Sequence, residues 1–233
     1  IPFNCFPEVD FVTRELHENL YKELRRTGSP ADALLQAFRL TDEDMLRRSI
    51  TSSGCTACCC LLQDEARGRV IYTAHLGDSR AVLARSGSAT RMTSMTDHKA
   101  TDPLEAKRVI EAGGHIINDR VNGMLAMTRA LGDHMLKMPM LPNDVVSNVP
   151  DITSTDVTKQ DSFIILACDG VWDVINDQQA VQLVLESMRE LTPIARQLEA
   201  DGRSMAEILS RMLVEEALAR GSNDNISCLV IFL

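Results

Sequence analysis

A chain of 233 residues with 45% hydrophobic content is long enough for one large domain, or two small ones, around a buried core. Its net charge of −9 argues against a nucleic-acid-binding protein, which normally has a basic surface, and suits a protein that binds cations. No apolar run approaches the ~18 residues of a membrane-spanning helix, and seven cysteines without the spacing of a disulfide framework favour the cytoplasm or the nucleus.

Two helices and four strands are predicted in the first part of the chain. Apolar residues at helical spacing predict a helix over residues 8–26. The second helix begins at Ser29 and Pro30, a capping residue followed by a first-turn proline, and continues to about residue 49. The strands are residues 55–62, 69–76, 80–85 and a short one near 89–93, with a hairpin turn at Gly87 and Ser88 between the last two.

Helices and strands also alternate in the rest of the chain. Asp102 and Pro103 open a helix that stops at Gly113. Further strands are predicted near residues 145–149, 152–155, 163–168 and 226–233, and further helices over about 177–190 and 203–220. Helices grouped around runs of hairpin strands favour α+β layers in a single domain, 1–233, and not a doubly wound sheet.

Two carboxylates stand beside strands of the predicted core. Asp169 ends an apolar run typical of a buried strand, and Asp224 precedes the closing apolar run of the chain. Such groups cost desolvation free energy unless a cation meets them, and Mg²⁺ and Mn²⁺ prefer carboxylate oxygens. The pair therefore indicates a metal-assisted hydrolase. We expect the two carboxylates to lie within ~6 Å of each other, the reach over which they can share an ion. The strands 55–62, 163–168 and 226–233 are expected to be central and mostly buried.

Eight short segments carry a family resemblance. Each is a weak signal alone, but together they follow the order found in the metal-dependent serine/threonine protein phosphatases of the 2C type, the PPM family, which the chain resembles over roughly residues 10–233. The segments are Ser-Gly-Cys-Thr-Ala at 53–57, Gly-Asp-Ser-Arg at 77–80, Thr-Asp-His-Lys at 96–99, Glu-Ala-Gly-Gly at 111–114, Arg-Val-Asn-Gly at 120–123, Thr-Arg-Ala-Leu-Gly-Asp at 128–133, and those around Asp169 and Asp224.

This resemblance implies both a fold and a chemistry. The fold is a central sandwich of two antiparallel β-sheets flanked by α-helices on both sides, and two Mg²⁺ or Mn²⁺ ions activate a bridging water that attacks phosphorus in line. By the resemblance, Asp169 and Asp224 are ligands of one core ion, and Asp78 with Asp169 helps to hold a third, weaker ion. The local sequence also permits an alternative for Asp78, in which its side chain caps a turn and pairs with Arg80.

Three further residues are expected near the metal ligands, and no catalytic residue is assigned. Asp173 is expected either to support the metal ligands without contacting the ion or to cap a helix. Gly170 is expected to lie beside the ligands or the phosphate. Arg129 either orients the phosphate or a metal-bound water, or forms a structural ion pair. We expect His98 to be a hydrogen-bonded structural histidine and not a catalytic one.

The family's Asp-Gly-His-Gly-Gly motif, whose aspartate bridges both metals, is not found ahead of the first helix, where the chain reads Ile-Pro-Phe-Asn-Cys-Phe-Pro. The chain is therefore expected to lack the N-terminal strands and first metal motif of the family, and to have negligible activity on its own. It is either an incomplete version of an active enzyme or a pseudophosphatase that serves as a binding or regulatory module. The retained Asp169 and Asp224 favour the enzyme. We expect it to be a monomer that acts on phosphoprotein substrates and binds regulatory protein partners.

Two clusters of sulfur-containing residues are given structural interpretations. Cys55 and Cys59 face one side of a strand and Cys58 and Cys60 the other, so four thiolates cannot converge on a metal. Five methionines between residues 124 and 140 are expected to fill an irregular core rather than a docking surface.

Overall fold

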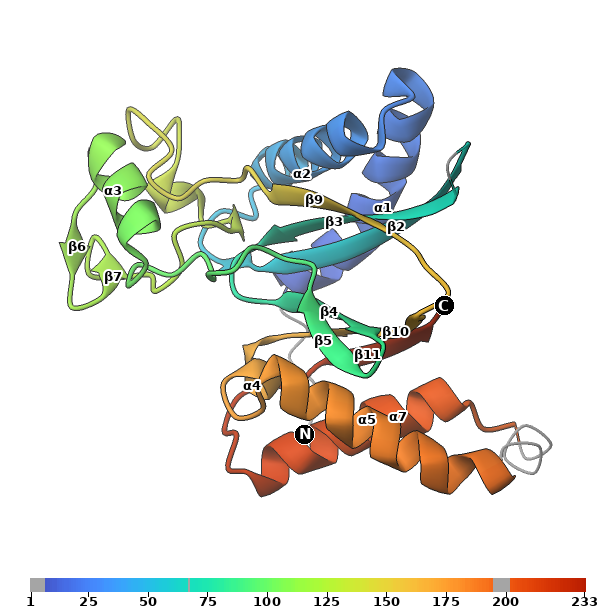
Figure 1. The fold of residues 1–233 in the computed structure, drawn as a ribbon. Helices are drawn as coiled ribbons and strands as arrows, with labels where there is room; N and C mark the ends of the chain where they lie inside the picture. Colours follow the sequence, from blue (N-terminus) through green and yellow to red (C-terminus); the bar gives the residue numbers. More distant parts are fainter. Residues whose placement is uncertain (1–6, 67, 195–201) are drawn as a thin grey trace.

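The computed structural model describes residues 7–66, 68–194 and 202–233. Two antiparallel sheets lie face to face, with one pair of helices outside each sheet (Figure 1). A segment of mostly irregular structure, residues 99–149, projects from one end of this sandwich. This arrangement confirms the α+β fold class with helices on both sides of a sandwich.

The first sheet and its helices form the upper half of Figure 1. Ser29 caps the second helix by accepting a hydrogen bond from the backbone N–H of Asp32, as its sequence predicts. Apolar side chains of the helices, including Phe11, Leu34 and Phe38, are buried against this sheet. The elements are α1 (Pro7–Thr27), α2 (Pro30–Arg47) and the sheet β2 (Ala57–Glu65), β3 (Gly68–Leu76) and β9 (Asp151–Asp156), in that order.

The second sheet has its helices on the opposite side of the sandwich. Asn176 and Gln179 form a capping box at the start of α5, which explains why this helix begins where predicted. Buried residues of both helices, such as Val181 and Leu213, pack on Val82 and Ile165 of the sheet. The elements are β11 (Cys228–Phe232), β10 (Asp161–Ala167), β4 (Arg80–Arg85) and β5 (Ser88–Arg91), in sheet order, with α5 (Asp177–Leu191) and α7 (Met205–Ala219).

The space between the two sheets is filled by a third apolar cluster. Ile71 of β3 packs there with Leu83 of β4 and Ile164 of β10, all fully buried. The four cysteines alternate as predicted, although Cys55 belongs to the short strand β1 (Gly54–Cys55) and the other three to β2. Cys58 and Cys60 face this cluster, while Cys55 and Cys59 face the one beneath α1 and α2. Burial raises the pKa of all four thiols, to about 12 for Cys59, so they are unreactive packing groups.

The predicted central position is correct for β10 but wrong for the other two strands. Among the described residues, β2 pairs only with β3, and β11 pairs only with β10, so both lie at sheet edges. Leu62 is 39% exposed and Leu229 is 52% exposed. An apolar run shows that a strand faces a core but does not show whether both of its edges are paired.

The 99–149 segment has a small core of its own, built from Val109, Val121, Leu136, Val145 and Val146. Its elements are α3 (Pro103–Glu111), β6 (Ile116–Ile117), β7 (Arg120–Val121), β8 (Leu131–Gly132) and η1 (His134–Leu136), and β8 pairs with β1 (Gly54–Cys55). The strand predicted near 145–149 is wrong, since this stretch forms one isolated bridge, from Ser147 to Arg129. Its apolar pattern reflects packing of the valines and not a ladder of hydrogen bonds.

The methionines of this segment also differ from their prediction. Met124, Met135, Met138 and Met140 are each more than half exposed, and only Met127 is partly covered. The short elements here leave too little buried volume for them, so the expected methionine core is wrong. No helix of the described residues has the length and hydrophobicity to cross a lipid bilayer.

Candidate metal site

The two carboxylates singled out by the sequence line the same pocket. Asp169 begins the short helix α4 (Asp169–Trp172) directly after β10, and Asp224 lies in the loop before β11. Because β10 and β11 pair antiparallel, with Ala167 opposite Cys228, the end of one strand meets the start of the other. The pocket rules out an arrangement at opposite ends of the fold, and Asp173 also lines it.

Two charges in this pocket, those of Asp169 and Asp224, are not balanced by basic groups. Among the described residues, neither Asp169 nor Asp224 forms an ion pair, and each accepts a hydrogen bond only from the N–H of the residue after it. Burial raises the pKa of the Asp169 carboxyl, and the nearby charges of Asp78, Asp224 and Asp173 raise it further. The folded chain thus gathers negative charge that only an external cation would neutralise.

Gly170 lets the two loops of the pocket approach closely. A Cβ atom at this position would lie 2.4 Å from the backbone oxygen of Asn225, a distance that real Cβ atoms do not reach. The Ser222 hydroxyl donates a hydrogen bond of 2.7 Å to the Gly170 carbonyl and ties the same loops together. Gly170 therefore holds Asp169 beside the Asp224 loop by its lack of a side chain.

Asp78 sits at the edge of this cluster, just after β3. Its side chain is buried, and the Lys99 ammonium lies 3.3 Å from Asp78 Oδ2 and 3.7 Å from Asp173 Oδ1. Burial raises the pKa of Asp78 although Lys99 opposes this effect. The alternative partner expected from the sequence is wrong, because Arg80 pairs with Asp97 and Asp177 instead.

Arg129 lies in a network of ion pairs and is not among the residues that line the pocket. Its guanidinium is 2.5 Å from Glu105 Oε1 and 2.7 Å from Asp151 Oδ1, and only 15% of its side chain is exposed. Burial opposes ionisation of Glu105, but hydrogen bonds from Arg129 and Thr128 outweigh it and lower the pKa of Glu105 to about 2. The structure shows the ion pairs of the structural alternative, and an orienting role for Arg129 stays a prediction.

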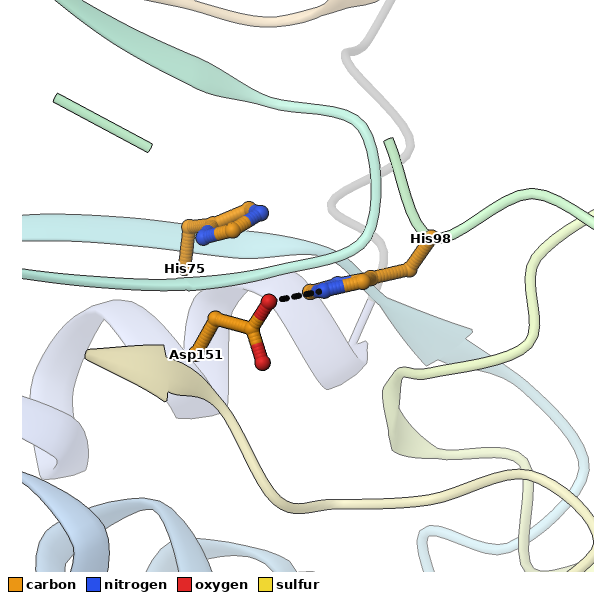
Figure 2. A group of neighbouring side chains, drawn as sticks. All are labelled: His75, His98 and Asp151. Atoms are coloured by element: carbon orange, nitrogen blue, oxygen red, sulfur yellow. Dashed lines mark hydrogen bonds and ion pairs between the residues drawn. The ribbon is translucent and has the colours of Figure 1, made fainter. Parts of the chain in front are cut away.

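Next to this network, His75, His98 and Asp151 form a cluster that the sequence did not reveal (Figure 2). Potential ligand atoms of the three lie within 4.8 Å of one another, and the two imidazole rings stack with centroids 4.4 Å apart. No local motif links the three residues, because they come from β3, the loop after β5, and β9. The pairing of β3 with β9 sets His75 opposite Asp151, and hydrogen bonds between His98 and Gly77 add the third residue.

Hydrogen bonds make this cluster a poor metal site. The backbone N–H of Gly77 donates to His98 Nδ1 at 3.0 Å, so the proton of this neutral ring is on Nε2, 3.2 Å from Asp151 Oδ2. A metal on Nε2 would have to displace that proton while Nδ1 still faced a donor. The prediction that His98 is a hydrogen-bonded structural histidine is confirmed.

His75 also carries its proton on Nε2. The Ser94 hydroxyl donates to the Thr96 carbonyl, so it accepts from His75 Nε2, at 2.9 Å. His75 Nδ1 is then a buried acceptor that has no hydrogen-bond partner in the described part of the chain. Burial, together with His98, lowers the pKa of His75 to about 4, and the ring stays neutral at physiological pH.

Comparison with known proteins places the chain among phosphatases. The sequence model described as Protein phosphatase 2C matches residues 10–226. Protein phosphatase 2C homolog 1 of Saccharomyces cerevisiae is 40% identical over 220 residues, and that of Schizosaccharomyces pombe is 36% identical over 230. These matches cover 89% and 96% of this chain but 70% and 59% of the two yeast proteins.

Solved structures show the same similarity. A Caenorhabditis elegans sex-determining protein matches 95% of this chain and 52% of its own, with 31% identity and a TM-score of 0.78. A serine-threonine phosphatase 2C from Toxoplasma gondii matches 96% of this chain and 81% of its own with a TM-score of 0.68; at 23% identity it supports the fold alone. The chain therefore spans about half to four fifths of these structures.

Proposed function

Because this chain belongs to the protein phosphatase 2C family, we propose that the protein hydrolyses phosphoserine and phosphothreonine in proteins with the help of Mg²⁺ or Mn²⁺. One observation carries the proposal: Asp169 and Asp224 line one pocket, and among the described residues neither carboxylate has a basic partner. The chain belongs to a phosphatase family, and its pocket holds carboxylates that lack basic partners. Such carboxylates are the oxygen donors that a metal-dependent hydrolase needs.

These donors fit a hard divalent cation. Carboxylate oxygens are the preferred ligands of Mg²⁺ and Mn²⁺, and the raised pKa of Asp169 shows that the pocket favours an added positive charge. When bound, such an ion supplies a nucleophilic water and neutralises charge on the phosphoryl group. We propose that Asp169 and Asp224 hold one ion, and that Asp78 with Asp169 holds a weaker one.

The remaining residues of the site position these ligands. Gly170 and Ser222 hold α4 against the Asp224 loop, which keeps Asp169 on the pocket wall. Asp173 closes α4 and leaves its carboxylate exposed to solvent, next to Lys99. Phosphoprotein substrates approach from the solvent side of the pocket, and their identity depends on surfaces beyond this cluster.

A phosphatase assay of the protein tests this proposal. We expect a version of the protein that includes the family's Asp-Gly-His-Gly-Gly motif to release phosphate from a phosphothreonine peptide with Mn²⁺ and to release none after chelation with EDTA. The 233 residues on their own should have negligible activity. Asp64→Asn, a solvent-exposed change of the same charge on β2, is the matched control for Asp169→Asn and should keep wild-type turnover. Turnover that survives EDTA would contradict the metal mechanism. Mn²⁺ binding without turnover would instead favour the alternative, a pseudophosphatase that acts as a binding module.

A further inference from the structure

Lys99 is the basic side chain that reaches the carboxylates of the proposed metal pocket. Its ammonium is 3.3 Å from Asp78 Oδ2 and 3.7 Å from Asp173 Oδ1. Arg80, two residues after Asp78 in the sequence, forms ion pairs with Asp97 and Asp177 instead. Among the described residues, Lys99 is therefore the one cation paired with this side of the pocket.

His98 holds Lys99 in this position. The His98 N–H donates to the Gly77 carbonyl at 3.0 Å, and His98 Nδ1 accepts from the Gly77 N–H at 3.0 Å. These two bonds clamp residue 98 to residue 77, so the residues that follow them in the chain, Lys99 and Asp78, are brought together. The stacked histidine cluster thus has a consequence for the pocket although it does not suit a metal itself.

The carboxylates in and beside the pocket consequently form two electrically different groups. Asp169 and Asp224 have no basic partner among the described residues, whereas Asp78 and Asp173 share the Lys99 charge. The Asp78 side chain is only 6% exposed, whereas the Lys99 side chain is 30% exposed and has a flexible stem. When a second cation arrives, Lys99 is the group that can move out.

We propose that Lys99 is a built-in counter-ion of the Asp78 side of the pocket, and that a divalent cation binding there must compete with its ammonium. The inference rests on the proposed function, since it concerns the weaker of the two proposed ion positions. It predicts that the two positions differ in affinity, because an ion at Asp169 and Asp224 meets carboxylates without a basic partner, while an ion at Asp78 meets a carboxylate already paired. Lys99 thereby sets the cation concentration at which the second position fills.

Calorimetric titration with Mn²⁺ at pH 8 tests this inference on the protein and its variants. We expect two classes of site in the wild type, and about a tenfold tighter weak class in Lys99→Gln, because a positive charge a few ångströms from the ion is removed. Lys99→Arg keeps the charge and should resemble the wild type. The matched control is Lys107→Gln, an exposed lysine of α3 paired with Glu111, which should change neither class.

A double variant tests whether the effect of Lys99 on Mn²⁺ affinity acts through Asp78. Asp78→Asn should abolish the weak class, and adding Lys99→Gln to it should then change nothing, because the group that Lys99 neutralises is gone. An unchanged weak class in Lys99→Gln, or equal tightening of both classes, would overturn the inference while leaving the proposed function intact. If the wild type binds no Mn²⁺ at all, the metal site of the proposed function fails and the inference fails with it.

Discussion

The pocket around Asp169 and the network around Arg129 are both rich in carboxylates, but the fold treats their charges differently. In the network, the Arg129 guanidinium lies 2.5 Å from a carboxylate oxygen of Glu105 and 2.7 Å from one of Asp151. The pKa of both carboxyl groups is below its usual range. In the pocket, the pKa of Asp169 rises. Carboxylates of the first kind stabilise the fold themselves, whereas those of the second kind lower its stability until a cation binds.

The two regions also have opposite effects on stability as the pH changes. Glu105, with its pKa lowered from 4.5 to about 2, contributes stability that is complete above about pH 4.5 and is lost as the pH falls toward 2. Asp169, with a raised pKa, favours the fold when it is protonated, and this advantage is lost as the pH rises through its folded pKa. The comparison therefore separates residues for ligand binding from residues for stability.

The largest expected effect comes from the pocket. Asp169→Asn should weaken Mn²⁺ binding, and with it phosphatase activity, by on the order of a hundredfold or more, because an amide is a poorer ligand than a carboxylate. Without metal, the same variant should be at least as stable as the wild type, since an unbalanced charge is removed. Calorimetry and urea unfolding in EDTA measure the two effects, and a strongly destabilised apoprotein would break the comparison.

Arg129→Met should have the reverse pattern. The change leaves the buried Glu105 without its main partner, and we expect a loss of about 3 kcal/mol in the free energy of unfolding. Arg211→Met, which breaks the exposed pair with Glu215, is the matched control and should cost about 0.5 kcal/mol or less. A stable Arg129→Met protein with weakened phosphopeptide binding would instead assign Arg129 the orienting role.

A third prediction concerns the neutral histidine beside the network. Because the pKa of His75 is lowered from 6.5 to about 4, the unfolded chain takes up a proton in this range and the folded chain does not. Stability should therefore be complete above about pH 6.5 and fall as the pH drops to 4, by on the order of 2–3 kcal/mol. His75→Asn should flatten this part of the unfolding curve, whereas the same change at the exposed His17 should not.

The smallest effect is expected at Gly170. A methyl group here must push the Asn225 carbonyl away, so Gly170→Ala should cost about 1–2 kcal/mol of stability and weaken Mn²⁺ binding by moving the Asp224 loop. Thermal unfolding and Mn²⁺ titration of the same samples measure both quantities. Unchanged Mn²⁺ affinity in a destabilised protein would show that the loop spacing does not control the ligands.

The sequence by itself determined the family, the α+β class and most element boundaries. Capping residues and periodicity act over a few neighbours, so α2 and α5 begin close to where predicted. Asp169 and Asp224 were also accessible from sequence, because Asp169 ends one apolar run, Asp224 precedes another, and each matches a family motif.

Only the tertiary structure decided which charges are balanced. Asp78 and Lys99 are 21 positions apart, as are Gly77 and His98, and 24 positions separate Glu105 from Arg129. The structure assigned Asp78 to Lys99 and not to its neighbour Arg80, and it placed β2 and β11 at sheet edges and the methionines on the surface. The physical reason is that ion pairing, edge position and burial depend on which distant segments meet, and local sequence patterns do not record those contacts.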